Sequence, residues 1–290
     1  MGLIELTITP REKDLGDGFS VHRVLPYAQR RMVGPFIFLD HMGPASFAAG
    51  HGLDVRPHPH IGLATVTYLF GGGLMHRDTL GSAQTIAPGD VNWMTAGRGI
   101  AHSERTAGGE RTHANALHGL QSWVALPKES EELAPEFHHH AAATLPAFSI
   151  GGAALTLIAG AAYGNEAPVR TYSPLFYVEA RLPEGGRLTL PQEYRERALY
   201  LIQGRLRIGD SVVEPLSLPV FAADGNVEVE ALEASHLVLL GGDPFPEKRF
   251  IWWNFVSTSE ERIVQAKKDW QTGRFGTIPG DEKEFIPLPE

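Results

Sequence analysis

Short apolar runs separated by glycine and proline make up most of this chain. It holds 32 glycines and 21 prolines among 290 residues. Runs such as 63–70 (LATVTYLF) and 236–240 (HLVLL) have the length of strands, and turn-forming residues bound them, as at Gly71-Gly72-Gly73. Turns at intervals of roughly ten residues are typical of antiparallel sandwiches and barrels. The sequence therefore predicts an all-β fold.

The predicted strands are spread along the chain, and one helix is expected after them. The strands are expected at 36–40, 63–70, 84–86, 90–95, 119–126, 155–159, 175–180, 199–202, 227–231 and 236–240. Near the carboxyl end, Thr258 and Glu261 have the spacing of a capping box, and Gly273 offers a helix stop. The apolar tail 285–289 (FIPLP) is expected to lie extended against another element.

Composition limits the classes of function. Hydrophobic residues make up 43% and charged residues 20% of the chain, which describes a globular protein with a substantial core. The net charge of −9 argues against direct binding of nucleic acid, because neutralising phosphates needs clustered cations. There is no cysteine, so disulfides, thiolate nucleophiles and cysteine-based zinc sites are excluded. Histidine, aspartate and glutamate are the available metal ligands.

Neither a signal peptide nor a membrane span is evident in the sequence. Residues 1–6 (MGLIEL) lack a basic patch followed by an apolar run. No apolar stretch has the length needed to cross a bilayer. We therefore expect a cytoplasmic protein without membrane contact.

Two pairs of metal-ligand residues share the spacing i, i+2. The first is His58-Pro59-His60, and the second is His102-Ser103-Glu104. In a β-strand, residues two apart project from the same face. If the two strands face each other, three imidazoles and one carboxylate converge on one point. A single His-x-His motif is weak evidence for a metal site. Here a second pair follows, after enough strands and turns for the chain to return, and the two pairs together predict a metal site.

Three neutral imidazoles with one carboxylate suit a divalent first-row transition ion. Octahedral Fe(II) would keep positions open for water, substrate or dioxygen, whereas a structural zinc site would be closed and four-coordinate. Ligand type does not separate Fe from Mn, Co, Ni, Cu or Zn. One carboxylate leaves a divalent site with net positive charge, which favours an anionic oxygen ligand such as an enolate or phenolate. Glu104 could be a ligand only, or also a base for a substrate hydroxyl.

Several other residues allow two interpretations. Asp40 and His41 could orient the ligand imidazoles or form a strand-end turn. His76 is expected to make a structural hydrogen bond rather than to bind metal. The run 138–140 (HHH) is assigned to a surface loop, since consecutive residues of an extended chain point to opposite faces. Four apolar residues could line a flat-sided pocket or simply fill the core: Phe36, Phe38, Trp93 and Met94.

A faint internal repeat indicates two similar halves. Residues 68–72 (YLFGG) resemble 200–204 (YLIQG), and each segment follows a strand-like run. On that register, the histidines of 58–60 fall opposite Leu190 and Gln192, so the second half looks like a copy that lacks the metal ligands. Chance similarity of two strand–turn segments is the competing interpretation.

Longer segments carry a family resemblance. They are 36–44 (FIFLDHMGP), 56–70 (RPHPHIGLATVTYLF), 76–81 (HRDTLG) and 88–104 (PGDVNWMTAGRGIAHSE). They resemble the pirin family of the cupin superfamily, and the carboxyl-terminal segments 273–275 (GRF) and 285–289 (FIPLP) are similar to the family's tail. The resemblance spans nearly the whole chain.

The resemblance implies a bicupin: two antiparallel β-barrels of the jelly-roll type with a short carboxyl-terminal helix and an extended tail. It implies a metal-binding cupin barrel in residues 1–145. Residues 146–290 would form a degenerate cupin barrel that lacks metal ligands and carries the helix and the tail.

The resemblance also implies a ligand set. Four residues fall on the family's metal-ligand positions: His58, His60, His102 and Glu104. Cupins in general often place a ligand glutamate just after the first histidine pair, where this chain has 62–65 (GLAT), so Glu104 supplies the carboxylate instead. We assign Glu104 the catalytic role as well.

Two classes of function follow from the family. It includes flavonol (quercetin) 2,3-dioxygenases, which implies Fe(II), a flavonol and dioxygen as partners, and ring opening with loss of carbon monoxide. It also includes iron-dependent nuclear regulators, which implies a non-enzymatic, redox-responsive protein acting through a protein partner. We favour the enzyme, because no nuclear targeting sequence or basic cluster is evident. A purely structural metal is a third hypothesis.

A monomer is expected, since the fused second barrel occupies a surface that a single-barrel cupin would use to dimerise.

Overall fold

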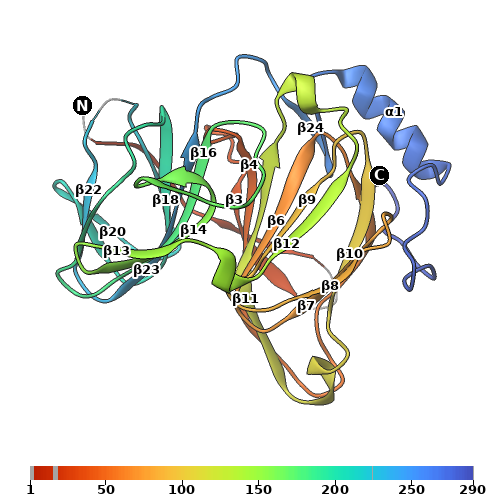
Figure 1. Cartoon of the computed structure of the whole chain (residues 1–290), viewed down its shortest axis with the longest axis horizontal. Coiled ribbons are helices and arrows are strands. Elements are labelled where there is room, and N and C mark those ends of the chain that lie inside the picture. Colours follow the sequence, from red (N-terminus) through yellow and green to blue (C-terminus); the bar gives the residue numbers. More distant parts are fainter. Residues whose placement is uncertain (1–2, 16–18, 224, 290) are drawn as a thin grey trace. The chain divides into compact units, whose positions relative to one another are not determined.

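Antiparallel strands form nearly all of the regular structure (Figure 1). The computed structural model describes residues 3–15, 19–223 and 225–289. Each of the ten segments expected to be strands lies inside an observed strand or overruns it by at most one residue. The prediction of an all-β fold is confirmed.

Contacts divide the described part of the chain into two compact units. The first takes in Met1–Glu12, His22–Leu39 and Ala143–Phe245; the second takes in Lys13–Val21, Asp40–Ala142 and Pro246–Glu290. The domain boundary at residue 145 stays a prediction. The chain passes from the second unit to the first close to it, between Ala142 and Ala143.

The first unit contains two sheets that share one aliphatic core. The larger sheet has the order β1 (Ile4–Ile8), β21 (Leu218–Phe221), β18 (Glu196–Gln203), β23 (Ser235–Gly242), β16 (Leu175–Leu182), β14 (Ala153–Ala162) and β13 (Ala147–Ile150), with β15 (Asn165–Glu166) beside β14. The smaller has the order β17 (Arg187–Thr189), β22 (Glu228–Ala231), β19 (Leu206–Ile208) and β20 (Ser211–Val213). Val178 and Leu239 of the larger sheet join Leu206 and Val229 of the smaller in a single buried cluster.

The second unit repeats this plan. Most of its larger sheet has the order β12 (Glu136–His140), β9 (Val91–Thr95), β6 (Leu63–Gly71), β11 (Asn115–Ala125), β4 (Phe36–Phe47), β3 (Ser20–Leu25) and β2 (Arg11–Asp14). The parts of β3 and β4 within residues 22–39, and the start of β2, belong to the first unit. Its smaller sheet has the order β5 (Asp54–His60), β10 (Ile100–Thr106), β7 (Leu74–Asp78) and β8 (Ala83–Ile86). A separate hairpin joins β24 (Phe250–Trp252) to β25 (Phe255–Ser257). Three single-turn helices lie in connections: η1 (Glu110–Thr112), η2 (Lys128–Ser130) and η3 (Ala142–Thr144).

The two segments of the internal repeat occupy equivalent places. Tyr68 lies on β6 and Tyr200 on β18, each an inner strand of its larger sheet, and both side chains are buried. Each strand is followed at once by a glycine, Gly72 or Gly204, whose φ angles are 81° and 92°. A Cβ at Gly72 would clash with the Ala116 carbonyl oxygen, so both the backbone conformation and the space require glycine. The repeat is therefore structural.

The helix and the tail form as predicted, with a different cap. Helix α1 (Glu260–Gln271) is capped by Ser259, whose hydroxyl oxygen accepts from the Arg262 N–H at 3.2 Å. The prediction that Thr258 caps the helix is wrong, because the Thr258 N–H and hydroxyl both donate to the Glu131 carboxylate. Among the described residues, no helix is long and apolar enough to span a membrane.

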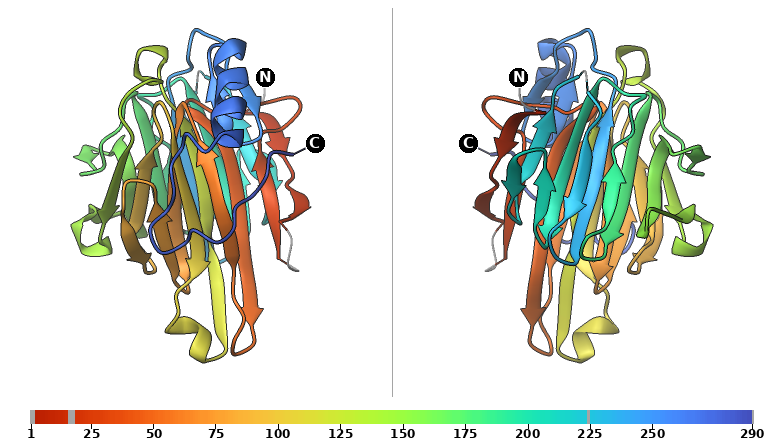
Figure 2. Two further views of the ribbon diagram at one scale, coloured as in Figure 1. Left: turned by 90° about the vertical axis from the view of Figure 1, so that its right-hand side faces the viewer. Right: turned by 90° about the vertical axis from the view of Figure 1, so that its left-hand side faces the viewer.

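The carboxyl-terminal tail lies extended beside β5 (Figure 2, left, dark blue beside orange). The Ile286 N–H donates to the Pro57 carbonyl at 2.8 Å, and the Trp270 indole N–H donates to the Ile286 carbonyl at 3.0 Å. Arg105 on β10 forms ion pairs with Asp281 at 2.7 Å and Glu284 at 2.8 Å. The expectation of an extended, docked tail is confirmed.

The run of three histidines lies on an edge strand rather than in the predicted surface loop. Strand β12 pairs with β9, with His138 opposite Trp93 and His139 opposite Asn92. The His139 ring approaches Asn92 at 2.8 Å, whereas the His138 ring approaches Glu136 at 3.1 Å. Strand pairing overrides the local polarity of this segment, and neighbouring histidines point to opposite faces.

Candidate metal centre

Three adjacent strands of the second unit's smaller sheet each carry a pair of polar residues spaced i, i+2. Strand β10 lies between β5 and β7, with His102 opposite both His58 and Asp78, and Glu104 opposite His76. Strand β5 is the edge strand, which is where a sheet tolerates a residue such as Pro59. All of the paired side chains are buried: His58, His60, His76, Asp78, His102 and Glu104.

The imidazoles of three predicted ligands form one group. A ligand atom of His58, of His60 and of His102 all lie within 4.8 Å of one another. The ring centroids are 4.9 Å apart for His58 and His60, and 4.4 Å for His58 and His102. In a second group, ligand atoms of His76, His102 and Glu104 also lie within 4.8 Å of one another. The structure brings the predicted residues to one face, and the assignment of four of them to one ion stays a prediction.

The free ring nitrogens of this cluster fit a cation. His58 Nδ1 lies 2.8 Å from the Arg56 carbonyl oxygen, which leaves its Nε2 available. His102 Nε2 is buried without a hydrogen-bond partner among the described residues. Neither ring nitrogen of His60 forms a direct hydrogen bond with a described residue, although the Asn254 backbone is close enough to raise its pKa slightly. Buried nitrogens without partners are costly, and a divalent ion would satisfy them.

The electrostatics also favour metal binding. Burial lowers the pKa of His58 to about 4 and lowers those of His60 and His102 well below their usual value, and neighbouring imidazoles add to these shifts. The three rings are therefore neutral at pH 7 and keep the lone pairs that ligation requires. The donor set of imidazole nitrogen and carboxylate oxygen suits a divalent transition ion.

Glu104 is held by the larger sheet across the interior. The Thr67 hydroxyl on β6 lies 2.7 Å from Glu104 Oε1 and 2.9 Å from the Gln121 amide on β11. Because a hydroxyl carries one proton, Thr67 donates to Glu104 when the Gln121 amide is turned to donate to Thr67. Burial raises the pKa of Glu104, while the Thr67 hydrogen bond opposes that shift.

The aromatic neighbours of the cluster differ from those considered in the sequence. The Trp123 ring on β11 contacts the His60 ring edge-to-face at 5.2 Å, and the Phe137 ring stacks on His76 at 4.2 Å. By contrast, Phe36 belongs to the first unit, where it packs against Tyr177 at 5.2 Å. The i, i+2 spacing places Gln121 and Trp123 on one face of β11, but nothing local indicates that Trp123 meets His60.

The remaining candidates from the sequence have other settings. Phe38 belongs to the first unit, and Met94 belongs to a core cluster packed against Phe137. His41 Nε2 lies 2.9 Å from His118 Nε2. His76 is in hydrogen-bond contact with a predicted ligand, because its Nδ1 lies 3.3 Å from His102 Nδ1.

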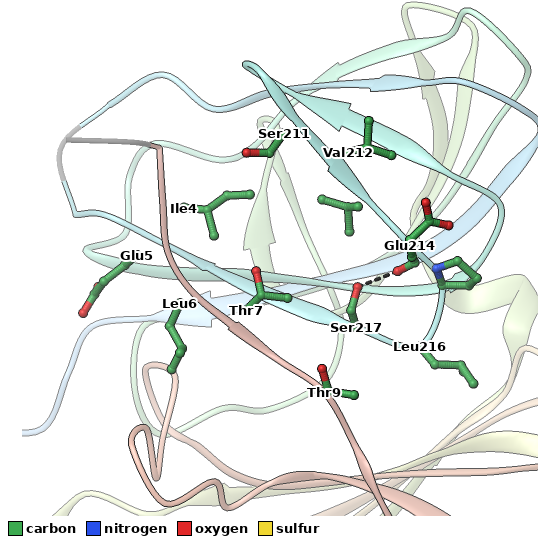
Figure 3. A pocket seen from close by; sticks show the side chains of 12 residues that line it. Ile4, Glu5, Leu6, Thr7, Thr9, Ser211, Val212, Glu214, Leu216 and Ser217 are labelled. Carbon is green, nitrogen blue, oxygen red and sulfur yellow. Dashed lines mark hydrogen bonds between the residues drawn. The ribbon is translucent and has the colours of Figure 1, made fainter.

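A pocket of about 660 Å³ lies in the first unit and shares no residue with the histidine cluster (Figure 3). Strand β1 and residues 211–217 line it, and its acidic side chains are Glu5 and Glu214. It contains no histidine, so it offers nothing resembling the donor set of the cluster.

The comparison with known proteins decides the family. The Pirin family profile matches residues 18–124, and the Pirin C-terminal cupin domain profile matches residues 177–276. A pirin-like protein from Caulobacter vibrioides is 52% identical over 99% of this chain and 100% of its own length. The chain belongs to the pirin family.

Two further relatives of this pirin-family chain bear on its fold. A Pseudomonas aeruginosa protein, provisionally named a quercetin 2,3-dioxygenase, is 42% identical over 97% of this chain and 89% of its own length. The crystal structure of quercetin 2,3-dioxygenase from Acinetobacter baumannii superposes with a TM-score of 0.90 at 33% identity, covering 98% of this chain and 95% of that one. The predicted bicupin fold is confirmed.

The metal-free pirin-family chain is expected to lose stability in acid. The unfolded state binds protons at His58 below pH 6.5, whereas the folded state does so only near pH 4. Above pH 6.5 the His58 ring is neutral in both states and does not change the free energy of unfolding. As the pH drops from 6.5 to 4, protonation of His58 in the unfolded state lowers that free energy by about 3 kcal/mol. Urea unfolding after chelation, at pH 7.5 and 4.5, measures the change. His58→Asn is the control and should show a shallower pH dependence; an equal dependence in both proteins would contradict the shift.

Proposed function

We propose that this chain is an Fe(II)-dependent dioxygenase that cleaves flavonols such as quercetin with release of carbon monoxide. The observation that carries the proposal is the buried cluster of His58, His60 and His102 with neighbouring Glu104. Support also comes from the similarity to quercetin 2,3-dioxygenase of Acinetobacter baumannii over nearly the whole chain.

The proposal gives each residue of the cluster a role. The three histidines and Glu104 hold one divalent ion, and their neutral rings leave the site with a net positive charge. A bound ion of this kind supplies Lewis acidity to substrate oxygens and electrons to dioxygen. An anionic oxygen is the substrate group that such a site favours, and the 3-hydroxyl of a flavonol becomes one when it loses its proton.

Glu104 is the proposed acceptor of that proton. Burial raises its pKa toward the range in which a carboxylate is an efficient base at neutral pH. The Thr67 hydroxyl, 2.7 Å away, keeps the carboxylate oriented. Dioxygen then adds both of its atoms across the central ring, which opens, and one ring carbon leaves as carbon monoxide.

Reconstitution tests the activity. The metal-free protein is loaded anaerobically with Fe(II), and in parallel with Mn, Co, Ni, Cu and Zn, before quercetin and air are added. We expect loss of the visible quercetin band together with equimolar carbon monoxide, fastest with Fe(II). Turnover with another ion only would overturn the choice of iron, and no turnover with any ion would overturn the enzymatic proposal.

The second candidate is a non-enzymatic regulator whose metal oxidation state changes the surface offered to a protein partner. Membership of the pirin family supports it, because the family includes both classes. This candidate needs a metal that is retained and redox-active without quercetin turnover. Stoichiometric iron that cycles between two oxidation states, in a protein that leaves quercetin intact, would favour it over the dioxygenase.

A further inference from the structure

A line of buried polar groups extends from the metal centre into the neighbouring strand. His102 Nδ1 lies 3.3 Å from His76 Nδ1, and His76 Nε2 lies 3.0 Å from Asp78 Oδ2. The exposed fractions are 1% for His102, 3% for His76 and 0% for Asp78. None of these groups can exchange its partner for bulk water, so the hydrogen bonds between them determine where their protons lie.

The outer end of the line is an ionised carboxylate fixed in a turn. Asp78 Oδ1 accepts from the backbone N–H groups of Leu80 at 2.9 Å and Ser82 at 3.0 Å. Burial by itself raises the pKa of Asp78, but the hydrogen bonds from His76 and Ser82 outweigh it and lower that pKa below its usual value. The carboxylate is therefore an acceptor only.

An acceptor at one end dictates the tautomers along the line. His76 must donate its Nε2–H to Asp78, and in a His76 ring that carries this single proton Nδ1 is an acceptor. His102 must then donate its Nδ1–H to His76. The lone pair of His102 is left on Nε2, the nitrogen without a hydrogen-bond partner among the described residues.

We propose that His76 and Asp78 are positioning residues that hold His102 as the Nδ1–H tautomer, with Nε2 ready to bind the metal. This inference rests on the proposed metal centre. Ligating histidines commonly donate their second N–H to a carboxylate or carbonyl, and here a second imidazole intervenes. Phe137, stacked on His76 at 4.2 Å and 10° between ring planes, holds the orientation of the intervening ring.

The same geometry separates this role from direct ligation by His76. Both nitrogens of His76 are engaged, Nε2 by Asp78 and Nδ1 by His102. Direct ligation through Nδ1 would break the hydrogen bond to His102 and leave the His102 tautomer undetermined. The positioning role requires neither change.

Asp78→Asn tests the inference, because the new amide can donate to His76 and reverse both tautomers. We expect the affinity for Co(II), measured by competition with a chromogenic chelator, to fall about 10–100-fold. Asp90→Asn is the matched control. Asp90 also accepts two backbone N–H groups, from Ala87 and Ala142, and its variant should bind Co(II) like the wild type. Unchanged affinity in Asp78→Asn would overturn the inference.

Nitrogen-15 NMR of the metal-free wild type supplies a test that needs no variant. We expect the His102 proton on Nδ1 and the His76 proton on Nε2, each assigned from its two-bond couplings. A His102 proton on Nε2 would overturn the inference even if Asp78→Asn failed to fold. A wild type that binds no Co(II) would instead overturn the metal centre on which the inference rests, so the two failures are distinguishable.

Discussion

His60→Ala is expected to abolish metal retention while leaving the fold largely intact. The variant removes one of three imidazoles, so the loss of affinity should exceed the 10–100-fold typical of losing an outer hydrogen-bond partner. The fold should persist because the deleted ring has no direct hydrogen-bond partner among the described residues. Metal content per chain after reconstitution and desalting, with circular dichroism of the same sample, measures both effects.

Two companion variants complete this experiment. Glu104→Ala should lose the metal as well, because it removes the carboxylate of the proposed ligand set. His113→Ala is the matched control, since His113 is exposed and its ring contacts the Thr112 hydroxyl. Stoichiometric metal in both His60→Ala and Glu104→Ala would show that the ligand assignment is wrong.

Arg249→Ala should lower the free energy of unfolding by about 3–5 kcal/mol, because it leaves a buried charge without its counter-ion. The Arg249 side chain is 1% exposed, and its Nε lies 3.3 Å from Oε1 of Glu131, which is 6% exposed. Arg249 also donates to the Leu126 carbonyl at 2.9 Å. Glu131 also accepts from Ser257 and Thr258, the residues just before the N-cap of α1. Chemical denaturation measures the loss.

An exposed ion pair provides the control for Arg249→Ala. Arg207 and Glu230 approach to 3.2 Å on the surface, with side-chain exposures of 52% and 27%. Arg207→Ala should cost less than about 1 kcal/mol, because water screens such pairs. Equal losses in Arg207→Ala and Arg249→Ala would mean that burial of the Glu131 partner has no energetic consequence.

The two units differ at the position of the histidine cluster. Their larger sheets share the strand and turn that end at Gly72 and Gly204. Where the second unit presents the histidines of β5, the repeat register predicts Leu190 and Gln192. Leu190 is buried in the aliphatic core of the first unit, and Gln192 contacts Asn226 on the surface. On that register, Leu190 adds a buried aliphatic side chain to the core where the second unit has a buried histidine.

Local features of the candidate site could be predicted, while its full extent could not. The pairs at 58–60 and 102–104 were recognisable because the side-chain period of a strand is fixed at two. The pair His76-Arg77-Asp78 has the same spacing, but nothing local shows that β7 lies next to β10. Trp123 was missed for the same reason, since its contact with His60 joins strands of different sheets.

The amino-acid sequence by itself determined the class of the fold and the positions of the ten expected strands. It also determined that His58 shares a strand face with His60, and His102 with Glu104. These properties depend on turn chemistry and on a period of two, which act within a few residues. Only the tertiary structure decided that β10 lies between β5 and β7, and that Ser259 rather than Thr258 caps α1. Strand order and capping depend on partners far along the chain, such as His102 for His76 and Glu131 for Thr258, and no local pattern specifies them.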